Sequence, residues 1–347
     1  MKKILLLGGS AQQTVAIRAA KKLGYFTIVC DYLPDNPGQY IADRFYGAST
    51  TDVEAIYEIA RKEGVDGILA YASDPAALPA AIVAERLGLP TNPAKSVEIL
   101  GLKHPWRQFL QKNGFACPKV YTFHPNTPIS EIQDHSDHFS FPLVVKPTDS
   151  SGSKGVTMLN NWSGLEDAVR RADSFSRNKI LLIEEYIQRG FPSIIGGDIF
   201  VWNGAIVLYG EMDKVHFLEL GPRAGGNMIP IQLSDIWGID LVRANVQAAM
   251  GETPEFIGTR LKALPGCHMH YVLHSYEAGR FQNIDIDDSI RRFVYREVIY
   301  KKEGDTVEVF DGAGKALGIL FLHFDTPEEM EHFCKNHNSL INIVLQK

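Results

Sequence analysis

Apolar and polar positions in the first hundred residues fall into short blocks whose period changes from one block to the next. Runs that are almost wholly apolar predict buried strands at Lys3–Leu7, Phe26–Cys30 and Gly67–Tyr71. Helical spacing, closed each time by a glycine, predicts helices at Thr14–Leu23, Asp52–Glu63 and Pro75–Leu87. Strands that alternate with helices predict a doubly wound parallel sheet.

The rest of the chain predicts a mixed arrangement that becomes rich in strands towards its end. Further helices are expected at Trp106–Asn113, Ser163–Ser174, Asp240–Met250 and Pro327–Lys335. Further strands are expected at Pro142–Val145, Ile180–Ile183, Asp198–Trp202, Ala205–Tyr209, His216–Leu220, His268–His274, Thr306–Val309, Ala316–Phe324 and Leu340–Leu345, with hairpin turns at Asn203-Gly204 and Asp311–Gly314. We expect three parts: a sheet domain (1–100), an α+β domain (101–260) and a β-rich segment (261–347).

Composition narrows the class of protein. A chain of 347 residues with 45% hydrophobic content is globular and large enough for several domains. The net charge of −6 gives no indication that the protein binds nucleic acid or an anionic membrane. Four scattered cysteines fit a reducing compartment, and no apolar run is long enough for a signal segment or a membrane span. We therefore expect a soluble cytoplasmic protein.

The turn after the first strand raises a dinucleotide-binding alternative. Asp31 at the end of the second strand has the residue type that such sites use for a ribose. The turn itself reads Gly8-Gly9-Ser10-Ala11-Gln12-Gln13, which does not match G-x-G-x-x-G. We therefore rank nicotinamide dinucleotide binding below an architectural role for this sheet, with its strand ends facing a substrate.

Phe141–Val156 carries the most informative chemistry in the chain. An apolar strand, Pro142–Val145, ends at Lys146, whose ammonium group can pair with phosphate oxygens. The loop Ser150–Gly155 follows and consists of small residues apart from Lys154, so its backbone N–H groups can approach anionic oxygens closely. The alternative is a mobile surface turn beside a solvated lysine.

Several motifs in a fixed order decide between these two interpretations. Lys103 opens a helix, Lys146 and its loop come next, and a strand then ends in Glu184-Glu185. Glu219 follows on another strand, directly before Gly221-Pro222-Arg223-Ala224-Gly225-Gly226. This order resembles the ATP-grasp superfamily, in particular its carboxylate–amine ligases and carbamoyl-phosphate-synthase-like members. The resemblance covers about three quarters of the chain and implies a sheet domain before a two-subdomain ATP-grasp domain with a nucleotide cleft.

The resemblance also implies ATP and Mg²⁺, with Mn²⁺ as an alternative metal, and assigns roles to residues. The residues that would contact the nucleotide are Lys103, Lys146, Ser151, Gly152, Ser153, Gly155, Glu184, Glu185, Ile187 and Asp198. Lys103 and Lys146 would meet the phosphates, the loop would close over them, and Glu184, Glu185 and Ile187 would form the hinge beside the adenine. Arg223 would stabilise the transferred phosphoryl group, and Glu219 would bind the metal.

Two departures from the family pattern concern the metal site. The pattern is Glu-x-Asn-Pro-Arg, and Gly221 stands where the asparagine ligand is usual, so Asn227 is the candidate replacement. The family also has a few dozen more residues where Lys214 and Val215 adjoin. Either the protein lacks that segment or the sequence omits it; a Cα separation well above ~3.8 Å between the two residues would favour omission.

The activity that the resemblance implies is an ADP-forming ligase that activates a carboxylate as an acylphosphate for attack by an amine. Two alternatives remain: a nucleotide-binding protein without turnover, and carboxyphosphate or carbamoyl-phosphate-type chemistry on bicarbonate. Partners would be small-molecule carboxylates and amines, and a homodimer is possible. Asp74, after the third strand, would face the substrate or serve as a turn-forming residue.

Overall fold

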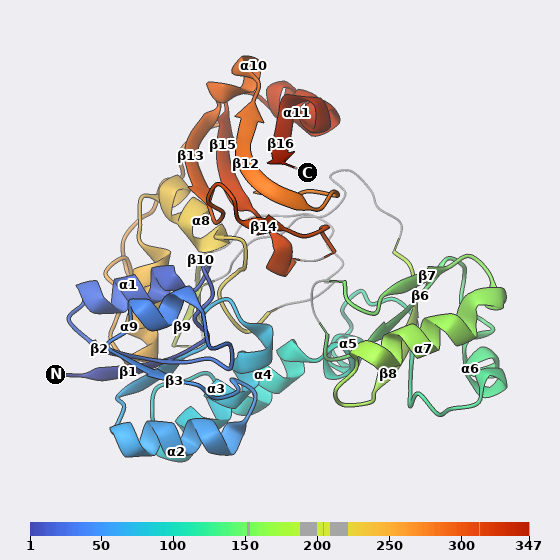
Figure 1. The fold of residues 1–347 in the computed structure, drawn as a ribbon. Helices are drawn as coiled ribbons and strands as arrows, with labels where there is room; N and C mark the ends of the chain where they lie inside the picture. The colour runs from blue at the N-terminus through green and yellow to red at the C-terminus, as the bar shows by residue number, and fades with distance from the viewer. Residues whose placement is uncertain (151–152, 188–199, 204, 209–220, 312, 347) are drawn as a thin grey trace.

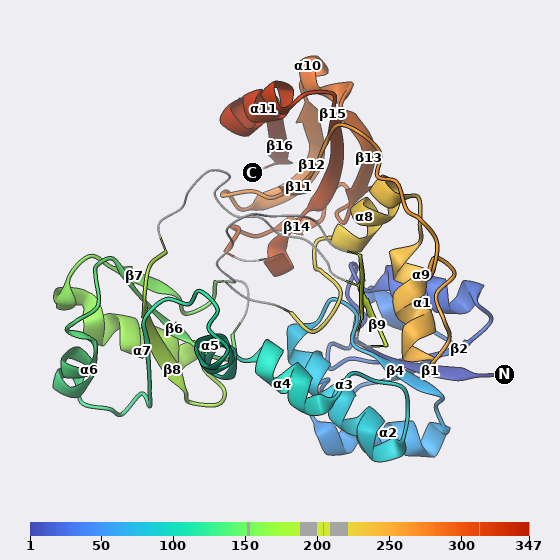
Figure 2. The ribbon, with the colours of Figure 1, turned by 180° about the vertical axis from the view of Figure 1, so that it is seen from behind.

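The structure, a computed structural model, describes residues 1–150, 153–187, 200–203, 205–208, 221–311 and 313–346. Figures 1 and 2 show three bodies: an N-terminal parallel sheet with its helices, a lobe formed by residues 103–187, and a C-terminal pair of sheets. In both views the lobe stands apart from the other two bodies. Within the described residues, none of the helices combines the length and the apolar character needed to cross a membrane.

The N-terminal sheet has the predicted doubly wound parallel form. Its elements are β1 (Lys3–Leu7), α1 (Thr14–Lys22), β2 (Phe26–Cys30), the 3-10 turn η1 (Pro37–Tyr40), β3 (Arg44–Tyr46), α2 (Val53–Glu63), β4 (Gly67–Leu69) and α3 (Asp74–Leu87). The strand order is β3-β2-β1-β4, and every pair is parallel. Its two central strands, β1 and β2, are mostly apolar because helices cover both faces of the sheet.

A helix from far along the chain completes one face of this sheet. Helices α2 and α3 pack on one face. Helix α1 and α9 (Leu241–Ala249) pack on the other, where Val242 and Val246 join Ile4 and Leu6 in one apolar cluster. At Gly67 a Cβ would lie 2.3 Å from the carbonyl oxygen of Ala249, so the close approach of α9 to β4 requires glycine there.

The lobe is an antiparallel sheet with order β5-β8-β6-β7. Its elements and the helices before it are α4 (Ala94–Gly101), α5 (Lys103–Lys112), β5 (Val120–Phe123), α6 (Ile129–Ser136), β6 (Leu143–Pro147), β7 (Thr157–Leu159), the 3-10 turn η2 (Trp162–Gly164), α7 (Leu165–Phe175) and β8 (Leu181–Glu185). Alternate residues Leu143 and Val145 point to α6 and α7. Val144 and Lys146, which alternate with them, therefore occupy the opposite face.

The C-terminal body has two three-stranded sheets, with orders β11-β15-β13 and β14-β12-β16. Its elements are β11 (Cys267–Leu273), β12 (Gly279–Ile286), α10 (Asp288–Arg291), β13 (Val294–Ile299), β14 (Thr306–Val307), the 3-10 turn η3 (Ala313–Lys315), β15 (Gly318–Phe324), α11 (Pro327–Leu340) and β16 (Ile341–Gln346). Helix α8 (Ile229–Trp237) packs against β11 and connects this body to the rest.

Some predictions for these regions were wrong. The expected hairpin at Asp311–Gly314 does not form, because β14 pairs with β12 while β15 pairs with β11 and β13. Strand β15 is almost wholly buried between two partners, so it has no open edge for β14. Helices α4, α8 and α10 and strands β3, β7, β12 and β13 were not predicted. The hairpin around Asn203 is confirmed by β9 (Phe200–Trp202) and β10 (Ala205–Leu208), and His216–Leu220 lies outside the described residues.

Candidate active site

A buried cluster of three charged side chains lies on the face of the lobe sheet that α6 and α7 do not cover. Lys146 on β6 and Glu184 on β8 are diagonal neighbours, because Val144 is the register partner of Glu184. Arg107 of α5 donates from Nε to Glu184 Oε2 at 2.8 Å and from Nη2 to Oε1 at 3.2 Å. Lys146 Nζ donates to the same Oε1. All three side chains are at most about a tenth exposed.

The cluster pairs two cationic side chains, Arg107 and Lys146, with the single carboxylate of Glu184. Burial acts to raise the pKa of the Glu184 carboxyl, but the hydrogen bonds and charges of Arg107 and Lys146 outweigh it, so the pKa lies below its usual value. Glu184 is therefore ionised at neutral pH and shares one negative charge between two cations. Lys146 therefore shares its carboxylate partner with Arg107.

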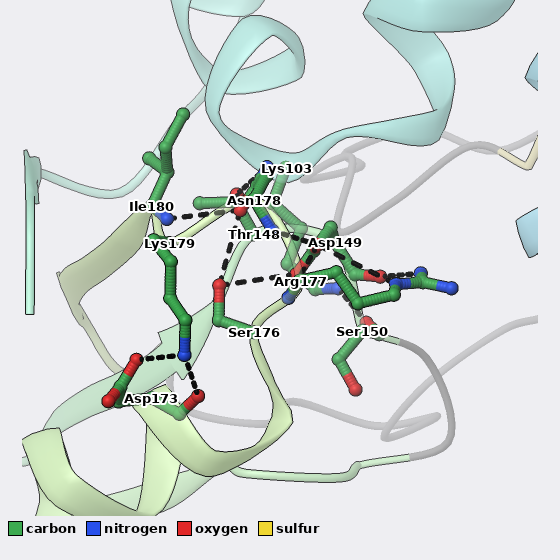
Figure 3. Close-up of polar contacts among 10 residues, drawn as sticks. All are labelled: Lys103, Thr148, Asp149, Ser150, Asp173, Ser176, Arg177, Asn178, Lys179 and Ile180. Atoms are coloured by element: carbon green, nitrogen blue, oxygen red, sulfur yellow. Dashed lines mark hydrogen bonds and ion pairs between the residues drawn. The ribbon is translucent and has the colours of Figure 1, made fainter.

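Lys103 lies at the start of the small-residue loop, as Figure 3 shows. Its backbone N–H donates to the carbonyl oxygen of Thr148 at 3.0 Å, and its Nζ donates to the carbonyl oxygen of Ser150. Both predicted lysines therefore flank the same loop, Lys146 from the end of β6 and Lys103 from the first turn of α5. The N-terminal turn of a helix adds a partial positive charge to this region.

The base of the loop is clamped to the turn between α7 and β8 (Figure 3). The Asp149 carboxylate accepts the backbone N–H groups of Arg177 and Asn178 at 2.9 and 2.8 Å. The Arg177 guanidinium donates back to the Asp149 carbonyl oxygen. Thr148 and Asn178 also bond through their side chains at 3.0 Å. The backbone of residues 148 and 149 is therefore held from two sides before the loop begins.

The far end of the loop depends on glycine. Gly155 has φ +73°, and a Cβ there would lie 3.1 Å from Phe175 Cβ and from Pro147 Cδ. Ser153 has φ +59° and is exposed. Ser151 and Gly152, which were predicted to cover the phosphates, lie outside the described residues, so the phosphate-binding role of this loop stays a prediction.

Glu185 and Ile187 take positions that differ from that of Glu184. The Glu185 carboxylate lies near the surface, where it accepts the N–H of Ser140 at 2.8 Å and pairs with Lys119 at 3.3 Å. Burial acts to raise the Glu185 pKa, and these two partners outweigh it and lower the pKa. Ile187 is half-buried at the end of the described segment. The backbone N–H of Glu185 donates to the carbonyl oxygen of Lys119. Contact of this hinge with adenine stays a prediction.

Arg223 lies against the N-terminal sheet. Its Nε and Nη2 donate to the two carboxylate oxygens of Asp74 at 2.7 and 2.8 Å, and Nη1 donates to the Ala224 carbonyl oxygen at 3.0 Å. Asp74 is the first residue of α3, at the carboxyl edge of β4. The structure therefore joins two residues that the sequence singled out separately, 149 positions apart.

The predicted metal site is only partly within the described chain. Asn227 is held at φ +52°; its N–H donates to Gln12 Oε1 at 2.7 Å, and its Oδ1 lies 3.5 Å from Gln12 Nε2. Glu219, Asp198 and the Lys214–Val215 junction lie outside the described residues. Within the described ranges, no three His, Cys, Asp or Glu side chains gather closely enough to hold a metal ion. The described residues therefore do not complete a magnesium site.

Sequence reasoning missed four residues that position this site: Arg107, Gln12, Asp149 and Arg177. A signal existed for Arg107, because it follows Lys103 by four positions on a helix and so shares its face. For Gln12, Asp149 and Arg177 the partners are distant in sequence or lie in turns, and no periodicity indicates them.

A cavity of about 290 Å³ lies elsewhere, between α8 and the C-terminal sheet. It is lined by Asp235, Leu264, His268, Tyr295, Arg296 and His323. The His268 and His323 rings stack at 4.6 Å across neighbouring strands. This cavity shares no residue with the lysine-rich site described above.

The chain resembles known proteins at several levels. Residues 109–192 match the family model described as the D-ala D-ala ligase C-terminus. A phosphoribosylamine–glycine ligase of Pyrococcus abyssi is 33% identical over 162 residues, which cover 45% of this chain and 36% of the relative. A formate-dependent phosphoribosylglycinamide formyltransferase of Bacteroides thetaiotaomicron is 30% identical over 197 residues, or 54% of this chain and 48% of the relative. The match thus spans less than half of each relative.

Solved structures resemble the whole chain. An L-amino acid ligase from Bacillus licheniformis has a TM-score of 0.76 at 18% identity, with 100% of this chain and 99% of that chain covered. A phosphoribosylglycinamide synthetase from Anaerococcus prevotii has a TM-score of 0.69 at 15% identity, with 99% and 100% covered. At such identities the likeness concerns the fold. The chain thus has the fold of ATP-grasp ligases, and residues 109–192 match the family model of the D-ala D-ala ligase C-terminus.

Proposed function

We propose that the chain is an ATP-dependent, ADP-forming ligase that activates a carboxylate as an acylphosphate and transfers the acyl group to an amine. One observation carries the proposal: Lys146 shares the buried Glu184 carboxylate with Arg107, next to a small-residue loop that Lys103 also contacts. Phosphoryl transfer depends on positioned cations around the nucleotide phosphates. The names of the curated relatives, which include ligases, support this reaction class.

We further propose the division of labour that the resemblance implies. Residues 1–100 would help to bind the substrates, and residues 101–260 would hold ATP between two subdomains. In the first step, a carboxylate oxygen attacks the γ-phosphorus, the bond from that phosphorus to the bridging oxygen breaks, and ADP leaves. In the second step, the amine nitrogen attacks the acyl carbon, inorganic phosphate leaves, and the nitrogen loses a proton.

Each cation has a place in this scheme. Lys103 and Lys146 would bind phosphate oxygens of the nucleotide, and Arg223 would meet the charge that spreads over the transferred group. Mg²⁺ is expected with ATP, but the roles of the two lysines and Arg223 do not depend on it. The acylphosphate must be kept from water until the amine attacks, which is the role proposed for the Ser150–Gly155 loop.

A binding protein without turnover is the second candidate, and Gly221 favours it. At that position the family pattern has an asparagine ligand, and glycine offers no side-chain oxygen. Such a protein would bind ATP without releasing ADP when acids and amines are added.

The test is ADP release from Mg-ATP across a panel of amino acids, small carboxylates, amines and bicarbonate. Lys146→Met removes the charge and leaves Arg107 to pair with Glu184; Lys179→Met, an exposed lysine of the same lobe, is the control. We expect release that needs both an acid and an amine and is lost only in Lys146→Met. Release with bicarbonate alone would instead indicate carboxyphosphate chemistry, and ATP binding without stimulated release would favour the binding protein.

A further inference from the structure

The carboxyl edge of the N-terminal sheet holds the turn that contains Arg223. Asp74 follows β4, and its two oxygens accept a fork of two N–H groups from Arg223 at 2.7 and 2.8 Å. Arg–carboxylate pairs of this bidentate kind fix the plane of the guanidinium as well as its position. The Asp74 and Arg223 side chains are 32% and 21% exposed, so the pair is partly shielded from water.

The guanidinium of Arg223 donates three hydrogen bonds to neighbouring groups. A guanidinium has five N–H donors in a rigid fork. Asp74 takes one from Nε and one from Nη2, and the Ala224 carbonyl takes one from Nη1. Within the described part of the chain, one N–H on Nη1 and one on Nη2 thus have no acceptor. Two donors on neighbouring nitrogens suit the oxygens of a phosphoryl or carboxylate group.

A second contact holds the other end of the same turn. Gln12, in the turn after β1, accepts the Asn227 N–H at 2.7 Å. Strands β1 and β4 are direct neighbours, so Gln12 and Asp74 project from adjacent strand ends. Asn227 and Met228 both have positive φ, at 52° and 60°, a backbone form that non-glycine residues keep only when their surroundings hold it.

From this geometry we infer that Asp74 is a positioning residue for Arg223. It fixes the guanidinium so that the two remaining N–H groups face the oxygens of the transferring group. The N-terminal sheet would then act on the phosphoryl-transfer step itself as well as on substrate binding. This inference rests on the proposed ligase activity.

The test compares Asp74→Asn, Asp74→Ala and Asp74→Glu with Glu252→Gln. Glu252 also links the 221–260 region to the N-terminal sheet, through Lys2 at 2.9 Å and Tyr25, but at the opposite edge of the sheet. We expect Asp74→Asn and Asp74→Ala to lower kcat by about 10- to 100-fold, because misplacing a catalytic group by ~1 Å can cost about 100-fold. The KM for ATP should stay within about 3-fold, since ATP binding would rest on other residues.

Two further results are expected. Asp74→Glu should recover much of kcat, because it restores the carboxylate, and Glu252→Gln should leave kcat unchanged. An unchanged kcat in a folded Asp74→Ala protein would overturn the inference. An effect confined to the KM of the amine would also overturn it, because Asp74 would then contact the substrate directly.

A measurement without turnover separates this inference from the proposed function. The Nε–H signal of Arg223 in a nitrogen-15 NMR spectrum, assigned with Arg223→Lys, should shift in Asp74→Asn and exchange faster with water. If wild type releases no ADP with any substrate while this signal responds, the ligase proposal fails and the positioning contact stands. A signal that does not respond overturns the positioning role, whatever the activity.

Discussion

Removing the negative charge of Glu184 is the sharpest perturbation that the structure offers. Glu184→Gln keeps the shape of the side chain but leaves Arg107 and Lys146 facing a neutral amide. All three groups are buried, so water cannot restore the lost compensation. Breaking one partner out of a buried ion pair costs about 3–5 kcal/mol. A charge pair at ~4 Å contributes about 4 kcal/mol at an effective dielectric of ~20, which agrees with that range.

The assay must report on the lobe alone, because a chain of several domains does not unfold in one step. Hydrogen exchange of β6 and β8 measures local opening of these strands. A loss of about 3–5 kcal/mol lowers protection by about 10²- to 10³-fold, since each ~1.36 kcal/mol is tenfold. Protection of β1 and β2 in the N-terminal sheet should change little.

Glu185→Gln is the matched control, with the same chemistry one residue further on. Glu185 pairs with Lys119, whose side chain is 52% exposed, so its loss should cost no more than about 1 kcal/mol. Equal protection of β6 and β8 in the two variants would refute the reasoning. It would mean that the two cations find other compensation, or that the cluster is more hydrated than its burial indicates.

Three other outcomes follow from particular contacts. Gly155→Ala should destabilise the lobe by about 2–4 kcal/mol, from left-handed backbone strain and the clash with Phe175 and Pro147. Gly114→Ala, in the same lobe, should show the strain alone, because its Cβ would meet no atom. Hydrogen exchange of the lobe strands compares the two variants, and equal protection would contradict the clash. Asp149→Asn should raise the KM for ATP more than it lowers kcat, because it weakens the hydrogen bonds from the Arg177 and Asn178 N–H groups that hold the base of the loop. An unchanged KM for ATP in steady-state kinetics would contradict this. The pKa of Glu184 is lower in the folded protein than in the unfolded chain. The contribution of this carboxylate to stability is therefore full above about pH 4.3 and is lost as the pH falls through the pKa of the folded state. Hydrogen exchange of β8 measured across acid pH would contradict this if the protection of β8 stayed constant.

Local pattern determined much of the fold. The apolar runs at Lys3–Leu7 and Phe26–Cys30 predicted buried strands, and their alternation with helices predicted a parallel sheet, which the structure confirms. The apolar run before Lys146 likewise placed that lysine at a strand end. These features follow from the period of the backbone and need no partner elsewhere in the chain.

Tertiary structure decided which charged groups meet. Lys146 could be interpreted as a solvated or a phosphate-binding lysine until β8 and α5 brought Glu184 and Arg107 to the same face of the lobe sheet. The pairing of Asp74 with Arg223 joins residues 149 positions apart, and no local pattern encodes such a contact. A periodic pattern records which side of an element is apolar. The partner of a polar side chain depends on how whole elements pack, and so the sequence named the candidate residues while the fold set their electrostatics.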